Sequence, residues 1–262
     1  MDISFIGSGN LAWHLAPALD NAGYIVREVY SRNPKHAEAL TGRLYQADVM
    51  ASLDFSNSKS RIFIIAVPDD CIQVVATEIV LPDEAYLIHT SGSQPLSSLQ
   101  FAAAKSTAIF YPLQTFSRDK RVDFKTTPIF IESSDEECER VLTVMAKSIS
   151  TNVNRIDSDG RKALHVAAVF ASNFTNHMLR VSKDILEKNS LSFDLLKPLI
   201  SETINKSLSV GPEQAQTGAA RQCDLLVLDQ HVELLREDER VAHLYRIISQ
   251  HIIDTYGLEK NQ

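Results

Sequence analysis

The sequence predicts an α/β protein, a doubly wound and mostly parallel sheet followed by an all-helical region. Three observations lead to this prediction. Over about the first 156 residues, short apolar runs alternate with stretches of helical periodicity. A glycine-rich turn follows the first apolar run directly, and from residue 158 onward the pattern is almost wholly helical. Strands separated by helices of this length favour right-handed crossovers and therefore a parallel sheet.

The elements of the first region follow from local residue types. Strands are expected where apolar runs are rich in β-branched residues. Pro34 suits the first turn of a helix, and Asn33 before it is a residue type that caps helix N-termini. The expected strands are residues 3–6, 25–30, 62–67, 86–89, 108–111 and 129–131, and the expected helices include residues 11–22, 34–44 and 71–79.

One long helix is predicted from residue 158 to about residue 188. It carries two apolar stripes, and a helix that is apolar on two sides is normally buried between neighbours. The first stripe is Leu164, Ala168, Ala171, Met178 and Ile185, and the second is Val166, Val169 and Phe170. The change from an alternating to a helical pattern predicts two domains, residues 1–156 and residues 157–262.

The composition excludes several classes of function. Hydrophobic residues make up 44% and charged residues 23% of the 262 positions, as in ordinary soluble globular proteins. No apolar run reaches the roughly 18 residues of a membrane span, and the first residues resemble a strand rather than a signal peptide. A net charge of −7 argues against nucleic acid or an acidic membrane as partner. Three dispersed cysteines match no zinc spacing and suit a cytoplasmic protein without a metal site.

The glycine-rich turn has the spacing of a dinucleotide-binding motif. Gly7 allows a tight turn, Gly9 allows a pyrophosphate to approach the backbone, and Ala12 allows close helix packing. The free N–H groups and the dipole at the helix start favour a bound anion. The residues expected to hold the pyrophosphate are Gly7, Ser8, Gly9, Asn10 and Leu11. A purely structural turn is the alternative.

The second predicted strand ends in Tyr30-Ser31-Arg32 rather than in an acidic residue. An aspartate or glutamate at this place would bind the ribose 2′-hydroxyl of NAD. Ser31 and Arg32 instead offer a hydroxyl and a guanidinium, which suit a 2′-phosphate and therefore predict NADP. A solvated arginine on a loop is the alternative.

The other strand ends carry polar or turn-forming residues at the edge where such sheets bind ligands. Val67 and Pro68 are predicted to turn along the cofactor, although Pro68 also suits an ordinary helix start. Thr90 and Ser91 are predicted near the nicotinamide. His89 and Gln114 are predicted to face the substrate, and a buried, hydrogen-bonded histidine is the alternative for His89.

Polar residues on the long helix supply the candidate catalytic groups. His165 and Asn173 are eight residues apart, about 80° around an α-helix, so they could border one cleft. An imidazole can donate a proton as a carbonyl or imine takes up hydride, and an amide can orient the substrate. Hydrogen bonds to adjacent helices are the alternative. Further on, Arg221 could bind a substrate carboxylate with Asp224 holding it, unless the two form an exposed capping pair.

Together these motifs resemble a family of NADP-dependent oxidoreductases that join a Rossmann-like domain to a C-terminal domain of unknown function. The family is similar in plan to pyrroline-5-carboxylate reductase and the β-hydroxyacid dehydrogenases. The resemblance implies NADP as cofactor and a C-terminal domain like that of 6-phosphogluconate dehydrogenase, through which a homodimer forms. It rests on residues 7–12, 89–92, 112–116, 165–173 and 217–224.

The chain departs from the family pattern at three places. Ala219 follows Gly218 where proline is common, Tyr111 stands where histidine is frequent, and Val169 replaces a lysine of the β-hydroxyacid dehydrogenases. The lysine mechanism therefore cannot be transferred, which leaves His165 as the better proton donor. We predict hydride transfer between NADP(H) and a small polar carbonyl, imine or alcohol in the interdomain cleft. A non-catalytic NADP(H) sensor or a dimeric scaffold is the alternative.

Overall fold

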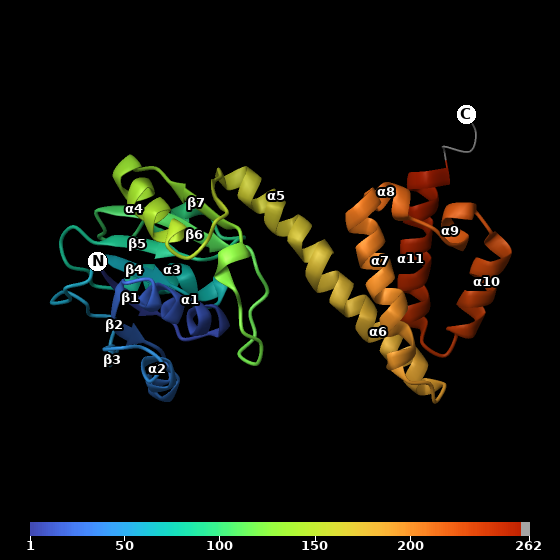
Figure 1. Cartoon of the computed structure of the whole chain (residues 1–262), viewed down its shortest axis with the longest axis horizontal. Helices are drawn as coiled ribbons and strands as arrows, with labels where there is room; N and C mark the ends of the chain where they lie inside the picture. Colours follow the sequence, from blue (N-terminus) through green and yellow to red (C-terminus); the bar gives the residue numbers. More distant parts are fainter. Residues whose placement is uncertain (258–262) are drawn as a thin grey trace. The chain divides into compact units, whose positions relative to one another are not determined.

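The computed structural model describes residues 1–257 and divides the chain into two compact units, Met1–Asn173 and Phe174–Gln262. The first unit holds one eight-stranded sheet in the order β3-β2-β1-β4-β5-β6-β7-β8 (Figure 1). Neighbouring strands are parallel except for β6 and β7, which are antiparallel. The strands are β1 Asp2–Ile6, β2 Ile25–Tyr30, β3 Asp48–Met50, β4 Ile62–Ile65, β5 Tyr86–His89, β6 Ser106–Pro112, β7 Ile129–Ser133 and β8 Val153–Arg155.

The predicted fold class is confirmed. All six predicted strands are present, and the two that the sequence analysis missed are three-residue edge strands, too short to carry a periodic signal. The helices and helical turns of the first unit are α1 Asn10–Asn21, α2 Pro34–Thr41, η1 Asp69–Cys71, α3 Ile72–Glu78, η2 Leu96–Leu99, η3 Phe124–Thr126, α4 Glu136–Lys147 and α5 Ser158–Ala168.

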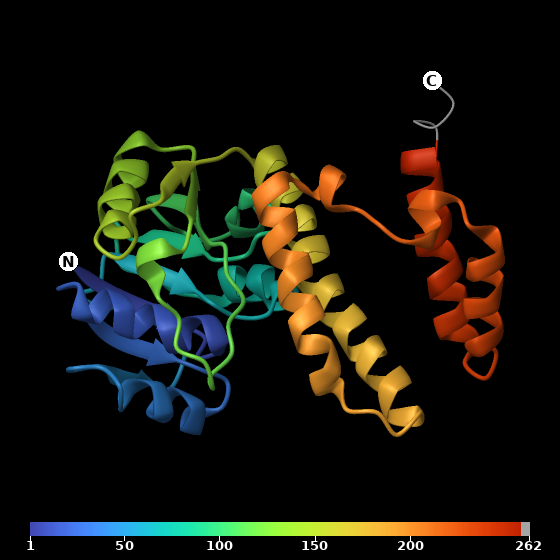
Figure 2. The same ribbon diagram turned by 45° about the vertical axis from the view of Figure 1, so that its right-hand side comes forward.

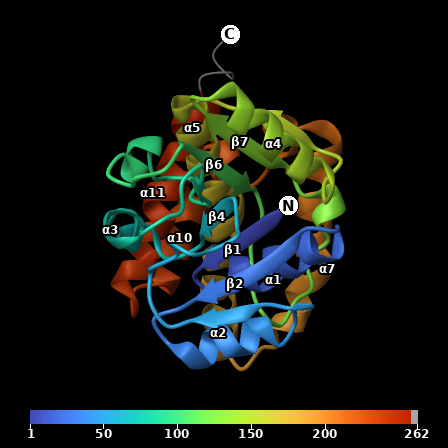
Figure 3. The ribbon, with the colours of Figure 1, turned by 90° about the vertical axis from the view of Figure 1, so that its left-hand side faces the viewer.

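Helices cover both faces of the sheet. Figure 3 shows α3 on one side and α1 and α4 on the other. On the side of α1 and α4, core residues such as Phe5 and Leu15 are fully buried, and on the side of α3 the core includes Phe63 and Leu87. Helix starts follow the expected capping rule, since the Asn33 side chain accepts a hydrogen bond from the Lys35 N–H at 3.1 Å. The two cores leave the carboxyl ends of the strands as the edge on which a site is built.

The predicted long helix is helical throughout residues 158–188, but it is not a uniform α-helix. A π-helical segment, η4 Val169–Phe174, separates α5 from α6 Thr175–Lys188. The structural division therefore falls after α5, later than the predicted boundary near residue 157, because α5 is anchored in the first unit by the buried Arg161. The assignment of residues 1–156 and 157–262 to separate functions stays a prediction.

The second unit is helical and exposes much apolar surface. α6 and α7 form a hairpin through η5, which Figure 2 shows from yellow to orange, and α9, α10 and α11 contact one another. Leu208 and Leu234 of this unit are 82% and 80% exposed. Val166 and Phe170 of the second predicted stripe are 56% and 65% exposed, so the burial expected of that stripe is not reached. The elements are η5 Phe193–Leu196, α7 Lys197–Val210, α8 Pro212–Ala215, α9 Ala219–Gln222, α10 Leu225–Leu234 and α11 Glu239–Tyr256. Among residues 1–257, no helix has both the length and the hydropathy required to cross a membrane.

Candidate functional site

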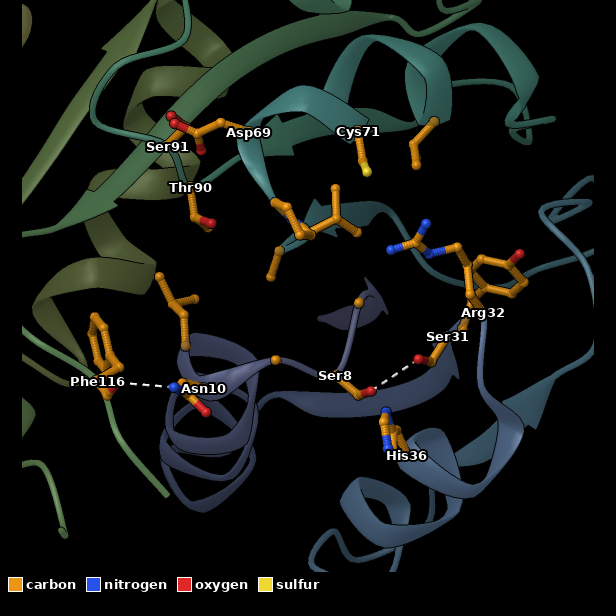
Figure 4. A pocket seen from close by; sticks show the side chains of 18 of the residues that line it. Ser8, Asn10, Ser31, Arg32, His36, Asp69, Cys71, Thr90, Ser91 and Phe116 are labelled. Carbon is orange, nitrogen blue, oxygen red and sulfur yellow. Dashed lines mark hydrogen bonds between the residues drawn. The ribbon is translucent and has the colours of Figure 1, made fainter. Parts of the chain in front are cut away.

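A pocket of about 1030 Å³ lies at the carboxyl ends of the parallel strands, entirely within the first unit. Such an edge is where ligands bind in doubly wound sheets. Figure 4 shows the side chains around it, which come from several strand ends far apart in the sequence. The predicted site residues that line it are Gly7, Ser8, Gly9, Asn10, Leu11, Ser31, Arg32, Val67, Pro68, Thr90, Ser91, Gln114 and His165.

The glycine-rich turn is shaped by its first glycine. Gly7 has φ +108°, and a side chain there would overlap the Ala66 carbonyl of the neighbouring strand end. The Gly7 N–H donates to the Tyr30 carbonyl at 2.8 Å, which ties the turn to the end of β2. Gly9 precedes α1 without a side-chain cap, so the first N–H groups of the helix face the pocket end without a competing side chain.

The end of β2 gathers polar side chains that an anion would need. Ser8 Oγ donates to Ser31 Oγ at 3.0 Å, and Arg32 and His36 lie beside this pair (Figure 4). Sequence analysis missed His36. His36 lies three residues after Asn33, in the first turn of α2. Residues three apart lie on the same face of a helix, so this spacing could have predicted that His36 is on the same side of α2 as Asn33.

A loop from residue 113 to residue 123, which we call the strap, is fastened to the glycine-rich turn. The Asn10 amide donates to the Phe116 carbonyl at 3.1 Å, and Arg118 Nη2 donates to the Ser8 carbonyl at 2.9 Å. The Arg118 guanidinium also lies 4.6 Å from the centre of the Trp13 ring, while Arg43 lies 4.2 Å from the same ring. Arg118 lines the pocket, and sequence analysis missed it because its contacts span more than a hundred residues of chain.

At another part of the pocket wall, Tyr111 meets His165. The Tyr111 hydroxyl and His165 Nδ1 are 3.1 Å apart, and both side chains line the pocket. Burial raises the pKa of Tyr111, and the positive charge of Arg161 partly opposes this. Gly92 makes the contact possible, since a Cβ at this residue would lie 2.5 Å from His165 Nδ1 and 2.6 Å from Tyr111 Cζ.

A buried arginine holds the Gly92 turn in place. Arg161 is fully buried on α5, and its Nε donates to Glu132 Oε2 at 2.8 Å. Its Nη1 donates to the Gly92 carbonyl at 2.6 Å and to the Ser91 carbonyl at 3.3 Å. One guanidinium therefore joins α5, β7 and the turn after β5.

Comparisons with known proteins agree with this geometry. Residues 2–91 match a family model described as NADP oxidoreductase, coenzyme F420-dependent, and residues 127–252 match a domain of unknown function, DUF2520. A Bacteroides fragilis protein described as an NADP oxidoreductase is 36% identical, with a TM-score of 0.86 over 97% of this chain and 98% of that one. The chain belongs to this NADP oxidoreductase family. NADP is accordingly the cofactor, as the sequence predicted.

More distant solved structures share the fold. A Thermotoga maritima protein is 23% identical, with a TM-score of 0.71 over 98% of this chain and 99% of that one. A reductive aminase from Aspergillus terreus, solved with NADPH and ethyl levulinate, is 13% identical, with a TM-score of 0.71 over 98% and 95%. An imine reductase from a Pseudomonas species is 16% identical, with a TM-score of 0.68 over 98% and 94%. A search of curated proteins gives no match.

His89, predicted to face the substrate, does not reach the pocket. It is fully buried, and its Nδ1 accepts a hydrogen bond from the Ser91 N–H at 3.2 Å. Burial, followed by the positive charge of Arg161, lowers its pKa to about 4. His89 therefore supports the Ser91 turn from behind, in the manner of the buried, hydrogen-bonded alternative.

Neither Asn173 nor Arg221 is among the residues that line this pocket. Asn173 is exposed in the π-helical segment, whose wider turn changes the angular spacing that an ideal α-helix would give between it and His165. Arg221 belongs to the second unit, where its Nη1 donates to the Glu213 carbonyl at 2.9 Å. Asp224 accepts from the Val227 N–H at 3.2 Å and caps α10, as the capping alternative expected.

We predict that His89 makes the stability of the first unit depend on pH. Its folded pKa of about 4 lies below its ordinary value of 6.5, so below pH 6.5 the unfolded chain binds a proton that the folded unit excludes. The free energy of unfolding should fall by about 3 kcal/mol as the pH drops from 6.5 to 4. In urea titrations, His89→Asn, which keeps a side-chain acceptor for Ser91, should lose this part of the pH dependence. An unchanged pH dependence would contradict the assignment.

Proposed function

We propose that the protein is an enzyme that transfers a hydride between NADP(H) and a small polar carbonyl, imine or alcohol. The observation that carries the proposal is a single pocket that combines two groups of side chains, one suited to bind phosphate and one suited to donate a proton. One wall gathers Ser31, Arg32 and His36, and another presents Tyr111 and His165. A phosphate-binding wall together with a proton-donating wall is the combination that a nicotinamide reductase requires.

The residues present suit NADP. Gly7, Ser8, Gly9, Asn10 and Leu11 would hold the pyrophosphate at the N-terminus of α1. Ser31 and Arg32, with His36, would bind the 2′-phosphate, since a guanidinium pairs well with phosphate oxygens. Val67 and Pro68 would pack along the cofactor, and Thr90 and Ser91 would lie near the nicotinamide. Arg118 on the strap would add a second positive charge close to the pyrophosphate.

The chemistry divides between the cofactor and the chain. NADPH, when bound, supplies the hydride. The polar groups near Gly92 supply the proton that the substrate oxygen or nitrogen needs. Of the two candidate catalytic residues from the sequence, His165 is the one that lines this pocket, and Gln114 is available to orient a polar substrate. Roles for Asn173 and Arg221 remain predictions from the sequence.

A homodimer is part of the proposal. The second unit exposes Leu199, Leu208, Leu225, Leu226 and Leu234, each at least 62% exposed. So many large apolar side chains exposed on one helical unit favour an interaction surface over a solvated one. We infer that a second copy of the chain covers it, because the helices carry apolar stripes that one chain leaves exposed.

The cofactor assignment predicts two distinguishable arginine effects. Arg32→Ala should weaken NADP binding by about 10- to 100-fold and leave NAD binding nearly unchanged, because only NADP carries the 2′-phosphate. Arg118→Ala should weaken the binding of NADP and of NAD by a similar factor of roughly 3 to 10, because both dinucleotides contain a pyrophosphate. Isothermal titration calorimetry measures both effects.

The matched control is Arg43→Ala. Arg43 stacks on the same Trp13 ring as Arg118 but does not line the pocket. It should change neither affinity. Equal affinities of the wild type and Arg32→Ala for NADP would reject the 2′-phosphate assignment.

Turnover separates an enzyme from a sensor. The purified protein should oxidise NADPH, followed at 340 nm, in the presence of some member of a panel of aldehydes, ketones and cyclic imines. Binding of NADPH without turnover across that panel would favour the non-catalytic sensor.

The dimer predicts a specific change in mass. Sedimentation equilibrium should give twice the chain mass of 29.2 kDa at micromolar concentration. Leu208→Glu together with Leu234→Glu should shift the protein toward the monomer, because burying two carboxylates in an apolar interface is unfavourable. A monomeric wild type would overturn this part of the proposal.

A further inference from the structure

Tyr111 and His165 form a pair whose position is set by contacts with three other parts of the first unit. Tyr111 lies near the end of β6, and its backbone is fixed by antiparallel pairing with Phe130 of β7. His165 lies one helical turn after Arg161, so both side chains are on the same face of α5. Arg161 donates a hydrogen bond to the Gly92 carbonyl. Because Gly92 has no side chain, the rings of Tyr111 and His165 have room to contact each other.

The other hydroxyls near this turn already have hydrogen-bond partners of their own. Thr90 Oγ1 donates to the Ile65 carbonyl at 3.3 Å. Ser91 Oγ accepts from the Ser93 N–H at 3.1 Å and from the Gln94 N–H at 3.0 Å. The Tyr111 hydroxyl instead has an imidazole as its partner, and its side chain is 8% exposed at the pocket wall.

We propose that Tyr111 is the catalytic residue that protonates the substrate and that His165 passes the replacement proton to it. This inference rests on the proposed function and names the proton path of the same site. A phenol is a stronger acid than a serine or threonine hydroxyl, and the imidazole can act as a relay because it carries two ring nitrogens.

The electrons and protons balance. As the substrate carbon receives the hydride of NADPH, the π electron pair of its C=O or C=N bond moves to the oxygen or nitrogen. That atom takes the proton of the Tyr111 hydroxyl. Tyr111 Oη takes the proton from His165 Nδ1, while the partly exposed ring gains one from solvent at Nε2. Proton exchange with solvent returns the ring to its Nδ1–H tautomer before the next turnover. The net change is one hydride and one solvent proton added to the substrate, and oxidation of an alcohol runs the same path in reverse.

The raised pKa of Tyr111 agrees with this role. Burial keeps the phenol protonated in the resting site, so the proton is present until the substrate acquires negative charge. Arg161 limits the rise and favours the phenolate that forms during the transfer. Arg161 therefore positions the turn beside Tyr111 and His165, and its positive charge also stabilises the phenolate form of Tyr111.

The test compares Tyr111→Phe, His165→Asn and the double variant in NADPH oxidation with aldehydes, ketones and cyclic imines. Tyr111→Phe should lower kcat by about 100- to 1000-fold, because it removes a general acid while keeping the ring. The Kd for NADPH should change less than about twofold. His165→Asn should lower kcat by a smaller factor, and the double variant should be no slower than Tyr111→Phe alone, because the two residues act as one relay.

Tyr86→Phe is the matched control. Tyr86 is a fully buried tyrosine of the same sheet, but its hydroxyl accepts from Arg61 Nη2 at 2.8 Å and it does not line the pocket. It should keep the wild-type kcat. The solvent deuterium isotope effect on kcat should be present in the wild type and change in His165→Asn, a readout that a purely structural role would leave alone.

The outcomes separate the two proposals. If the wild type reduces a member of the panel and Tyr111→Phe retains kcat within about threefold, the relay is overturned while the proposed function stands. The relay is also overturned if the kcat of the double variant falls by the product of the two single-variant factors. If the wild type binds NADPH but reduces nothing, the proposed function and the relay fall together. If Tyr111→Phe does not fold, the His165→Asn variant decides. An unchanged kcat and an unchanged solvent isotope effect in that variant overturn the relay and leave the proposed function standing.

Discussion

The buried contact of Arg161 with Glu132 and the Ser91–Gly92 carbonyls is the constraint on which the site depends. A charge buried this fully is tolerated only when it is paired and hydrogen-bonded, and removing one partner of such a pair costs about 3–5 kcal/mol. Here the arginine lies on α5, and its partners lie on two other elements, the end of β7 and the turn after β5. The contacts of Arg161 therefore fix the position of α5 against the sheet, and with it the position of His165 one helical turn later.

The fold was predictable because its signals are local. Apolar runs such as residues 62–65 and 86–88 are buried on both faces and are unbroken by charged or strongly polar residues, which is typical of inner parallel strands. Asn33 and Pro34 marked a helix start that the structure contains. The π-helical segment at Val169–Phe174 could not be predicted, because its residues carry no pattern that distinguishes a π-helical turn from an α-helical one.

The candidate site was predictable where it follows strand ends and not where it depends on distant contacts. Gly7, Ser31 and Thr90 follow predicted strands and line the pocket, as their positions indicated. Arg118 and Tyr111 become site residues only through the strap and through α5, which fold back from far along the chain. His89 is the last residue of β5 and directly precedes Thr90, but its side chain is fully buried and does not line the pocket. A sequence without burial information does not distinguish these two neighbouring residues.

The central claim is that NADP lies along this pocket with its nicotinamide beside the Tyr111–His165 pair. A crystal structure of the NADP complex tests it most directly. The account predicts the 2′-phosphate within hydrogen-bonding distance of Ser31 and Arg32, and the nicotinamide ring next to Thr90, Ser91 and the Tyr111 hydroxyl. A nicotinamide bound away from Gly92, with Tyr111 shielded from it by other side chains, would contradict the account.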